Sequence, residues 1–179
     1  MGCDAPFPKE YRPKMKFSTL MKSLGLAAIA LALGASRMTA QDKPASFGGT
    51  ASAALAAMKA RADELHVSGV AVVARAEGDA VASWSSKMIV VGSMTKAPSG
   101  TDKGSNLLGI AYAKAAEMAA TLKNSGSGVR PPLTGEFGWQ GGVVGKGKTG
   151  ILIAAFSGGR GEDDVSISRA GLTVLAASL

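Results

Sequence analysis

Apolar and polar positions are most clearly patterned near the C-terminus. A short apolar run, Ile151–Phe156, is bounded by glycines and predicts a strand buried on both faces. Ser157–Gly161 contains three glycines and predicts a tight turn. The acidic side chains of Glu162–Asp164 are typical of a first helical turn, because they complement its free N–H groups. Apolar residues then recur at helical spacing: Val165, Leu172, Leu175 and Leu179.

A second helix is expected near the start of the domain. Residues 41–49 have the composition of a linker, with Gly48 and Gly49 as breakers. Thr50 is expected to cap a helix that ends near Leu65. Its inner face would hold Ala54, Leu55, Met58, Ala62 and Leu65.

The pattern then changes to that of strands. Val70–Ala74 is rich in β-branched residues and predicts a strand. Gly78–Asp79 favours a turn, so Ala80–Trp84 is expected to return as the partner strand of a hairpin. Lys87–Val91 offers a further short strand.

The middle of the chain is expected to hold a loop, a helix and a glycine-rich hairpin. Residues 92–105 are rich in Ser, Thr, Gly and Lys and predict a surface loop. Asn106 can cap a helix that ends near Lys123. Arg130–Leu133 is expected to be extended, and a hairpin is expected at Gly141–Gly150. The marked stripe of the helix is Leu107, Ile110, Ala111, Lys114, Met118 and Leu122.

The predicted secondary-structure elements follow the order helix, two or three strands, helix, two or three strands, helix. Strands joined by hairpins imply an antiparallel sheet, here of about five strands, with helices packed on it. The sequence therefore predicts a single α+β domain over residues 50–179.

Residues 1–40 have a different character. Lys14, Lys16 and Lys22 precede an apolar run at residues 24–35, and small residues follow up to Ala40. These are the parts of a secretory signal peptide, and the run is shorter than the about 20 residues of a transmembrane helix. We expect cleavage after Ala40 and a periplasmic or secreted mature chain without a transmembrane segment. The alternatives are an amphipathic or buried helix and, for the upstream extension, a true start at Met15 or Met21 rather than Met1.

The net charge changes once residues 1–40 are set aside. They hold six of the 20 basic and two of the 13 acidic side chains, which leaves 14 basic against 11 acidic, a net charge of +3. The remainder has no Lys/Arg run interleaved with aromatic residues, so a nucleic-acid partner is not expected. Cys3 is the single cysteine, so the domain must be stabilised by its core rather than by disulfides.

Residues 142–149 match the phosphate-binding pattern G-x-x-x-x-G-K-T. That loop needs a strand before its glycines and a helix after its Thr. Here Gln140 and Gly141 precede the pattern, and a β-branched run follows Gly150. A glycine-rich hairpin with exposed lysines is the preferred interpretation.

Two further matches belong to penicillin-recognising serine enzymes: Ser93–Lys96 fits S-x-x-K, and Lys148–Gly150 fits K-T-G. That chemistry needs the Ser at the start of a helix, where the Lys activates it. The residues after Lys96 include Pro98 and cannot continue a helix. We therefore predict no catalytic residues.

A spaced set of residues near the C-terminus resembles a family motif. The set is Ser157, Gly158, Gly159, Gly161, Asp164 and Arg169–Gly171. It resembles the closing motif S-G-G-x-G-x-x-D…A-G of the GlcG/HbpS-type haem-binding family, a domain also found at the C-terminus of PduO-type proteins. Gly141, Gly142 and Gly150 resemble the family's glycine hairpin, and Ala113–Ala115 resembles its K-A helix. The resemblance covers residues 51–179 and implies a profilin-like fold and haem binding.

An axial ligand for haem, or a ligand for another metal, has few candidates. His66 is the single histidine, and its ring nitrogen could bind iron. The alternative is a histidine that complements the dipole at a helix C-terminus. Four methionines could act as soft ligands but at helical spacing are more typical of a core: Met58, Met88, Met94 and Met118. No metal-ligand spacing accompanies His66, so the metal stays unknown.

Large amphipathic side chains concentrate in residues 130–140. Phe137 and Trp139, beside glycines, could line a flat apolar ligand pocket. Arg130 or Lys114 could pair with a ligand carboxylate such as a haem propionate. Packing in a subunit interface or in the core is the alternative.

Three functions stay open from the sequence. The first is an exported module that binds haem or a related tetrapyrrole, without catalysis of its own. The second is a ligand-free accessory subunit of a larger extracytoplasmic assembly. The third is an S-x-x-K serine hydrolase.

A homo-oligomer is also predicted. The last helix has a second apolar side, formed by Ile167, Ala170, Val174 and Ala177, which one small sheet would not cover. Either this helix or Phe137–Trp139 is expected at the interface. The alternative is that the small alanines let the helix lie deep in the core of a monomer.

Overall fold

The computed structural model describes residues 46–148 and 150–179, within a compact unit formed by Gln41–Leu179. Its elements in chain order are α1 (Phe47–Glu64), β1 (Gly69–Glu77), β2 (Ser85–Val91), β3 (Thr95–Lys96), β4 (Ser105–Asn106), α2 (Leu107–Thr121), β5 (Gly142–Lys146), β6 (Gly150–Ser157) and α3 (Gly161–Ser178). The residues predicted as a signal peptide, and the cleavage site after Ala40, lie outside the described part of the chain.

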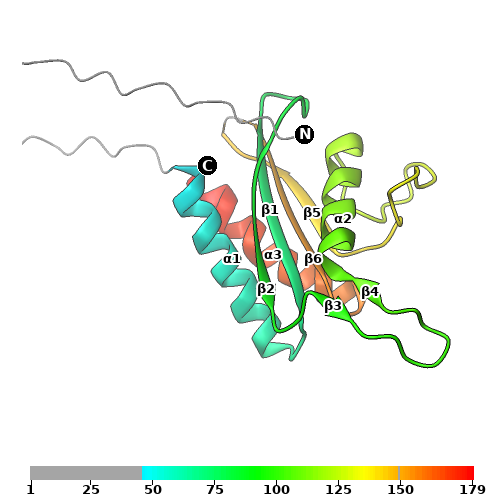
Figure 1. Cartoon of the computed structure of the whole chain (residues 1–179). Helices are drawn as coiled ribbons and strands as arrows, with labels where there is room; N and C mark the ends of the chain where they lie inside the picture. The colour runs from blue at the N-terminus through cyan, green and yellow to red at the C-terminus, as the bar shows by residue number, and fades with distance from the viewer. Residues whose placement is uncertain (1–45, 149) are drawn as a thin grey trace, which may run out of the picture. The chain divides into compact units, whose positions relative to one another are not determined.

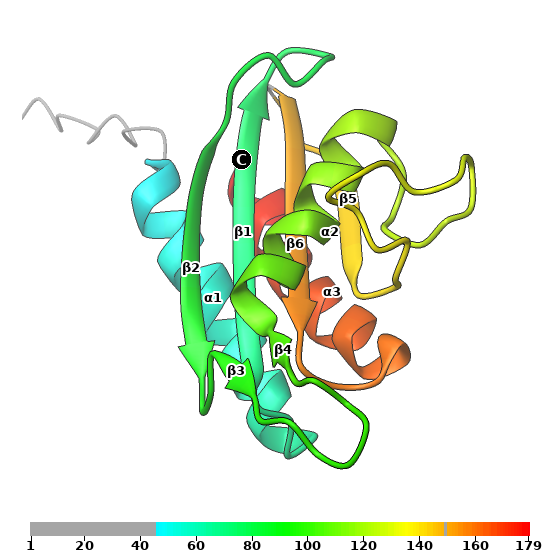
Figure 2. The same cartoon turned by 45° about the vertical axis from the view of Figure 1, so that its right-hand side comes forward.

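The main sheet has four antiparallel strands in the order β2-β1-β6-β5. A two-stranded ladder, β3-β4, stands apart from it. Helices α1 and α3 cover one face of the sheet and α2 covers the other, as Figures 1 and 2 show. The predicted α+β class with helices on an antiparallel sheet is therefore confirmed, with four strands in the main sheet instead of about five.

The central strands β1 and β6 are buried on both faces, as their apolar sequences predict. On one face Val73, Leu152 and Phe156 pack with α1 and α3. On the other, Ile151 and Ile153 pack beneath α2. Because successive side chains of a strand point to opposite faces of the sheet, β1 and β6 contribute to the cores on both faces.

Helix α1 begins earlier than predicted. Its N-cap is Ser46, so Gly48, Gly49 and Thr50 lie inside the helix rather than in a linker or at a cap. Phe47 packs against the core of the α1/α3 face. Because burial of an aromatic side chain outweighs the helix cost of a glycine, the helix extends back over both glycines.

The predicted hairpin partner Ala80–Trp84 is wrong. The strand that pairs with β1 is β2, with Arg75 opposite Ser85 and Gly69 opposite Val91. The predicted short strand Lys87–Val91 is thus the main part of β2. Val81 and Trp84 instead pack against the core under α2, and this tertiary contact draws their segment out of the ladder.

The predictions for α2 and for the C-terminal elements hold closely. The Asn106 side chain caps α2 by accepting a hydrogen bond from the Gly109 N–H at 3.0 Å. The helix ends at Thr121, and Leu122 follows in a left-handed conformation with φ +54°. The glycine hairpin is β5-β6, and Glu162, Asp163 and Asp164 occupy the first turn of α3.

The apolar side chains on the two sides of α3 are buried to different extents. Ile167 and Leu175 are fully buried in the core that α1 and the sheet share. Gly171 lies where α3 crosses α1, and a Cβ there would come within 2.5 Å of Met58 Sδ. On the second apolar side, Ile167 is fully buried and Val174 packs against the same core, whereas Ala170 is partly buried and Ala177 is exposed. The homo-oligomer therefore stays a prediction.

Candidate functional site

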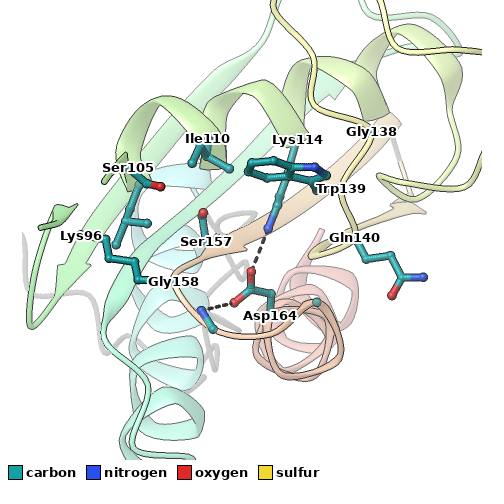
Figure 3. Close-up of a pocket in the computed structure, with 13 residues that line it drawn as sticks. Lys96, Ser105, Ile110, Lys114, Gly138, Trp139, Gln140, Ser157, Gly158 and Asp164 are labelled. Carbon is teal, nitrogen blue, oxygen red and sulfur yellow. Dashed lines mark hydrogen bonds and ion pairs between the residues drawn. The ribbon is translucent and has the colours of Figure 1, made fainter. Parts of the chain in front are cut away.

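A pocket of about 450 Å³ opens between α2, the β3-β4 ladder, the segment before β5 and the start of α3 (Figure 3). Leu107, Ile110 and Trp139 supply its apolar lining. Lys114, Ser157 and Asp164 line its deep polar side. The site thus combines segments that lie far apart in the sequence.

The deepest feature of the pocket is an ion pair between Lys114 and Asp164. Lys114 Nζ lies 2.8 Å from Asp164 Oδ2, and the two side chains are 4% and 3% exposed. Lys114 Nζ also donates to the Phe156 carbonyl at 2.8 Å, and Asp164 Oδ1 accepts from the Gly159 N–H at 2.8 Å. Each buried charge therefore has two partners, as burial at this depth requires.

The charge state of Asp164 depends on its neighbours. Burial raises the pKa of the Asp164 carboxyl above its ordinary value, because desolvation disfavours the ionised form. The Lys114 ammonium and the N–H groups of Gly158 and Gly159 act in the opposite direction. Without Lys114, only these two N–H groups would counter the rise in the Asp164 pKa that burial causes.

Gly141 lets the chain pass beside this ion pair. Its φ is +134°, and a Cβ there would collide with Lys114 Nζ and lie within 3.0 Å of the Asp164 Cβ. Its carbonyl accepts hydrogen bonds from the Phe156 N–H at 3.0 Å and from Ser168 Oγ at 2.7 Å. The position therefore requires glycine for both conformational and steric reasons.

The other residues of the family-like motif also have structural roles. Gly142, Gly150, Gly158 and Gly171 each approach another element too closely for a Cβ: Met118, Ala76, Ser68 and Met58 respectively. The Gly159 N–H donates a hydrogen bond to the Asp164 carboxylate. The motif thus coincides with the contacts that hold the end of β6 against α1, α2 and α3.

Ser157, the last residue of β6, has an unusual environment. It is 4% exposed and lines the pocket, and its hydroxyl oxygen faces the α2 side (Figure 3). Within residues 46–148 and 150–179 this hydroxyl makes no hydrogen bond. Because no fully enclosed side-chain N or O atom of these residues lacks a partner, the hydroxyl oxygen must be open to the pocket.

Trp139 is held by a loop that an ion pair closes. Arg130 forms a two-pronged pair with Glu136, with N–O distances of 2.6 and 2.8 Å, and Glu136 also accepts from the Leu133 N–H at 2.9 Å. These hydrogen bonds lower the pKa of Glu136 to about 2. Phe137 stacks on Trp139 with ring centroids 4.7 Å apart.

The structure brings together only two of the five predicted ligand-binding residues. Lys114 and Trp139 line the pocket. The Arg130 guanidinium is held by Glu136, and neither Arg130 nor Phe137 is part of the lining. His66 lies at the end of α1 and lines a separate hollow with Val67 and Gly92.

The methionines do not reach the pocket either. Met58 and Met118 are fully buried in the cores on the two faces of the sheet. Met88 packs against the core beneath α2, and Met94 is exposed. Nowhere in the described residues do three or more His, Cys, Asp or Glu side chains form a group that could hold a metal ion.

Sequence reasoning missed Asp164 as the partner of Lys114, as well as the pocket residues Lys96 and Gln140. One signal for the ion pair was present. Lys114 stands in the apolar stripe of α2, and a lysine on a buried face needs a buried acid. No local feature indicates which acid that is, because Asp164 lies 50 positions further on.

The phosphate-loop and serine-enzyme patterns lie in other structural settings than those enzymes use. Gly142–Lys146 is a strand, and the hairpin turn leads directly into β6, so no helix follows the glycines. Ser93 Oγ donates to the Thr95 carbonyl at 2.5 Å, and Lys96 belongs to the short strand β3. Neither pattern stands at the start of a helix.

Comparison of the chain with protein-family models and with curated proteins gives no match. No helix in residues 46–148 or 150–179 is both long and apolar enough to cross a membrane.

Proposed function

We propose that the chain is a small-molecule-binding module whose site is the pocket between α2, Trp139 and the start of α3. The observation that supports this most directly is the composition of the pocket. An apolar wall of Leu107, Ile110 and Trp139 faces a buried ammonium–carboxylate pair and a hydroxyl. A concave apolar site with a few convergent polar groups is the usual form of a small-molecule site.

Haem, the ligand implied by the family resemblance, does not fit this lining. Haem iron takes His, Met, Cys or Tyr as axial ligand, and none of these lines the pocket. His66 lies in a separate hollow of about 270 Å³. A haemin titration followed at the Soret band checks this: we expect no saturable shift. A shift that Ile110→Trp leaves intact and His66→Ala abolishes would place haem at the separate hollow and contradict the proposed site.

Binding of a small molecule can be tested without knowing its identity. The purified chain is incubated with a small-metabolite extract, separated from free compounds by gel filtration and analysed by mass spectrometry. We expect the wild type to retain a compound that Trp139→Ala does not retain. Leu133→Ala is the matched control, because Leu133 is 60% exposed in the same loop but does not line the pocket. Retention of nothing, or equal retention by Trp139→Ala, contradicts the proposal.

A role without catalysis and in an extracytoplasmic compartment completes the proposal. The export part rests on residues 1–40 alone. It is tested by intact-mass measurement, with a mature chain beginning near Gln41 as the expected result. Retention of Met1, Met15 or Met21 on the purified protein contradicts it.

The accessory-subunit alternative has one supporting observation. Val129, Leu133, Phe137 and Trp139 are 56%, 60%, 45% and 52% exposed on a single loop. Exposed apolar side chains gathered in this way mark interfaces in many proteins. Light scattering at low micromolar concentration tests the homo-oligomer form of this alternative, and a monomer mass contradicts it.

A further inference from the structure

We infer that the ligand of this pocket is a small planar molecule with one carboxylate, which accepts hydrogen bonds from Ser157 and Lys114. The inference rests on the proposed function and adds the chemical class of the ligand. Its basis is an inventory of hydrogen-bond donors and acceptors on the pocket lining.

Ser157 provides the first indication. It is 4% exposed and lines the pocket, and its hydroxyl makes no hydrogen bond within residues 46–148 and 150–179. A hydroxyl removed from bulk water costs free energy unless a partner replaces that water. A polar ligand atom at this position would satisfy it.

Lys114 provides the second indication. An ammonium group has three N–H donors, and the Phe156 carbonyl and Asp164 Oδ2 take two of them. No further acceptor in the described residues lies within hydrogen-bond distance of Lys114 Nζ. The third donor is therefore available to a ligand in the pocket, which Ser157 also lines.

The charges on the lining favour an anion. They are Lys96, Lys114 and Asp164, two cations against one anion, a net charge of +1. Asp164 already accepts from Lys114 and Gly159, so it offers little to a ligand that donates. The Lys96 side chain is 64% exposed, and its ammonium lies 3.9 Å from its nearest acid, Asp102. The group that fits these donors is an oxygen anion.

The anion should carry one charge rather than two. Glu162 and Asp163 stand in the first turn of α3, directly after Gly161 on the pocket lining. Arg160 pairs with both carboxylates, at 3.3 and 3.1 Å, so the three side chains together carry a net charge of −1. This remaining negative charge disfavours a phosphate dianion at this helix end. The apolar wall of Leu107, Ile110 and Trp139 fits a flat ring. A planar monocarboxylate satisfies both conditions.

Isothermal titration calorimetry on the full chain tests the inference with three probes of one shape: 2-naphthoate, 2-naphthamide and 2-naphthyl phosphate. We expect 2-naphthoate to bind at least about 10-fold more tightly than the neutral amide or the phosphate, as a charge-assisted hydrogen bond predicts. Ser157→Ala should weaken naphthoate binding about 10-fold and weaken binding of the amide, whose carbonyl is an uncharged acceptor, by less. Lys96→Gln should weaken naphthoate binding a few-fold, while the control Lys103→Gln, on the same loop but away from the lining, should not.

The outcomes separate this inference from the proposed function. If the amide binds as tightly as naphthoate, or if Ser157→Ala binds naphthoate as the wild type does, the carboxylate inference is overturned. The proposed function still stands in that case, provided that Trp139→Ala abolishes binding of the amide. Absence of naphthoate binding at millimolar concentration overturns the inference as well. The metabolite-retention experiment then decides separately whether the pocket binds any small molecule.

Discussion

The two faces of the sheet are held by different kinds of contact. On the α1/α3 face, apolar side chains fill the core, and Gly171 lets α1 and α3 approach closely. On the α2 face the core includes buried polar groups, among them Lys114, Glu117 and Ser157. The second face opens into the pocket of about 450 Å³, whereas the hollow beside His66 at the edge of the first face is smaller, about 270 Å³. Stability and binding therefore fall on opposite sides of the same two central strands.

The ion pair connects the two layers. Lys114 belongs to α2 and Asp164 to α3, so the contact passes around the end of β6 from one face to the other. A ligand on the α2 face would therefore touch a group that also anchors the helix on the opposite face. Substitutions at the ion pair should affect both layers, while substitutions within the α1/α3 core should affect stability alone.

The largest effect is expected for Lys114→Met. It leaves the buried Asp164 carboxylate without its ammonium partner, which costs about 3–5 kcal/mol when a buried pair is broken. Urea unfolding measures the loss. The double variant Lys114→Met/Asp164→Leu should recover more than half of it, because no charge is then left unpaired. A single variant within about 1 kcal/mol of the wild type would contradict the role given to the pair.

A smaller loss is expected for Gly171→Val on the α1/α3 face. The added side chain would overlap Met58, which is fully buried and has little room to move. Overpacking of this kind costs about 1–3 kcal/mol. Gly109→Ala is the matched control: its Cβ would meet only Asn106 atoms at 3.5 Å or more, so it should stabilise by about 0.5–1 kcal/mol. Loss of stability without loss of probe binding is the expected signature of this face.

How far the sequence predicted these two faces depends on how local each signal is. The Asn106 cap, the apolar strand β6 and the acidic first turn of α3 were predicted correctly, because each depends on neighbouring residues. The partner of β1 was misplaced, since Ala80–Trp84 and Ser85–Val91 both suit a strand. The packing of Val81 and Trp84 against the core decides between them, and that contact is not local.

The same distinction applies to the candidate site. Lys114 and Trp139 were predicted as ligand-binding residues from their chemical type, and both line the pocket. Arg130 was expected to pair with a ligand, but an acid six positions away holds it. Ser157 was predicted only as part of a motif. Whether its hydroxyl has a hydrogen-bond partner depends on residues that the fold brings next to it, and the sequence does not show which residues these are.

The loop that carries Trp139 should respond to acid in a defined range. The pKa of Glu136 falls from an ordinary 4.5 to about 2 in the folded chain, mainly through its hydrogen bonds to Arg130. A lowered carboxyl pKa adds stability above pH 4.5, and this contribution is lost as the pH falls toward 2. Glu136→Gln should therefore be less stable than the wild type at neutral pH, and the difference should vanish near pH 2.

Thermal unfolding at a series of pH values measures this difference. The double variant Arg130→Gln/Glu136→Gln should follow the pH profile of the Glu136→Gln single variant, since the pair is absent in both. If the wild type and Glu136→Gln keep a constant difference from pH 7 to pH 2, the ion pair does not set the acid response of the loop.

The smallest effect on stability is expected for Ser157→Ala, and it separates the two faces most sharply. Ser157 and Ser168 are both buried serines, 4% and 0% exposed, but only Ser168 has a hydrogen bond, to the Gly141 carbonyl at 2.7 Å. Ser168→Ala leaves a buried carbonyl with one partner fewer and should cost about 1–2 kcal/mol. Ser157→Ala removes a hydroxyl that has no partner among the described residues, so the free energy of unfolding of this variant should stay within about 0.5 kcal/mol of the wild type. Urea unfolding of both variants without ligand gives the comparison. If Ser157→Ala costs as much stability as Ser168→Ala, the Ser157 hydroxyl already has a partner in the folded chain. Ser157 would then not be a free hydrogen-bond donor for a ligand in the pocket.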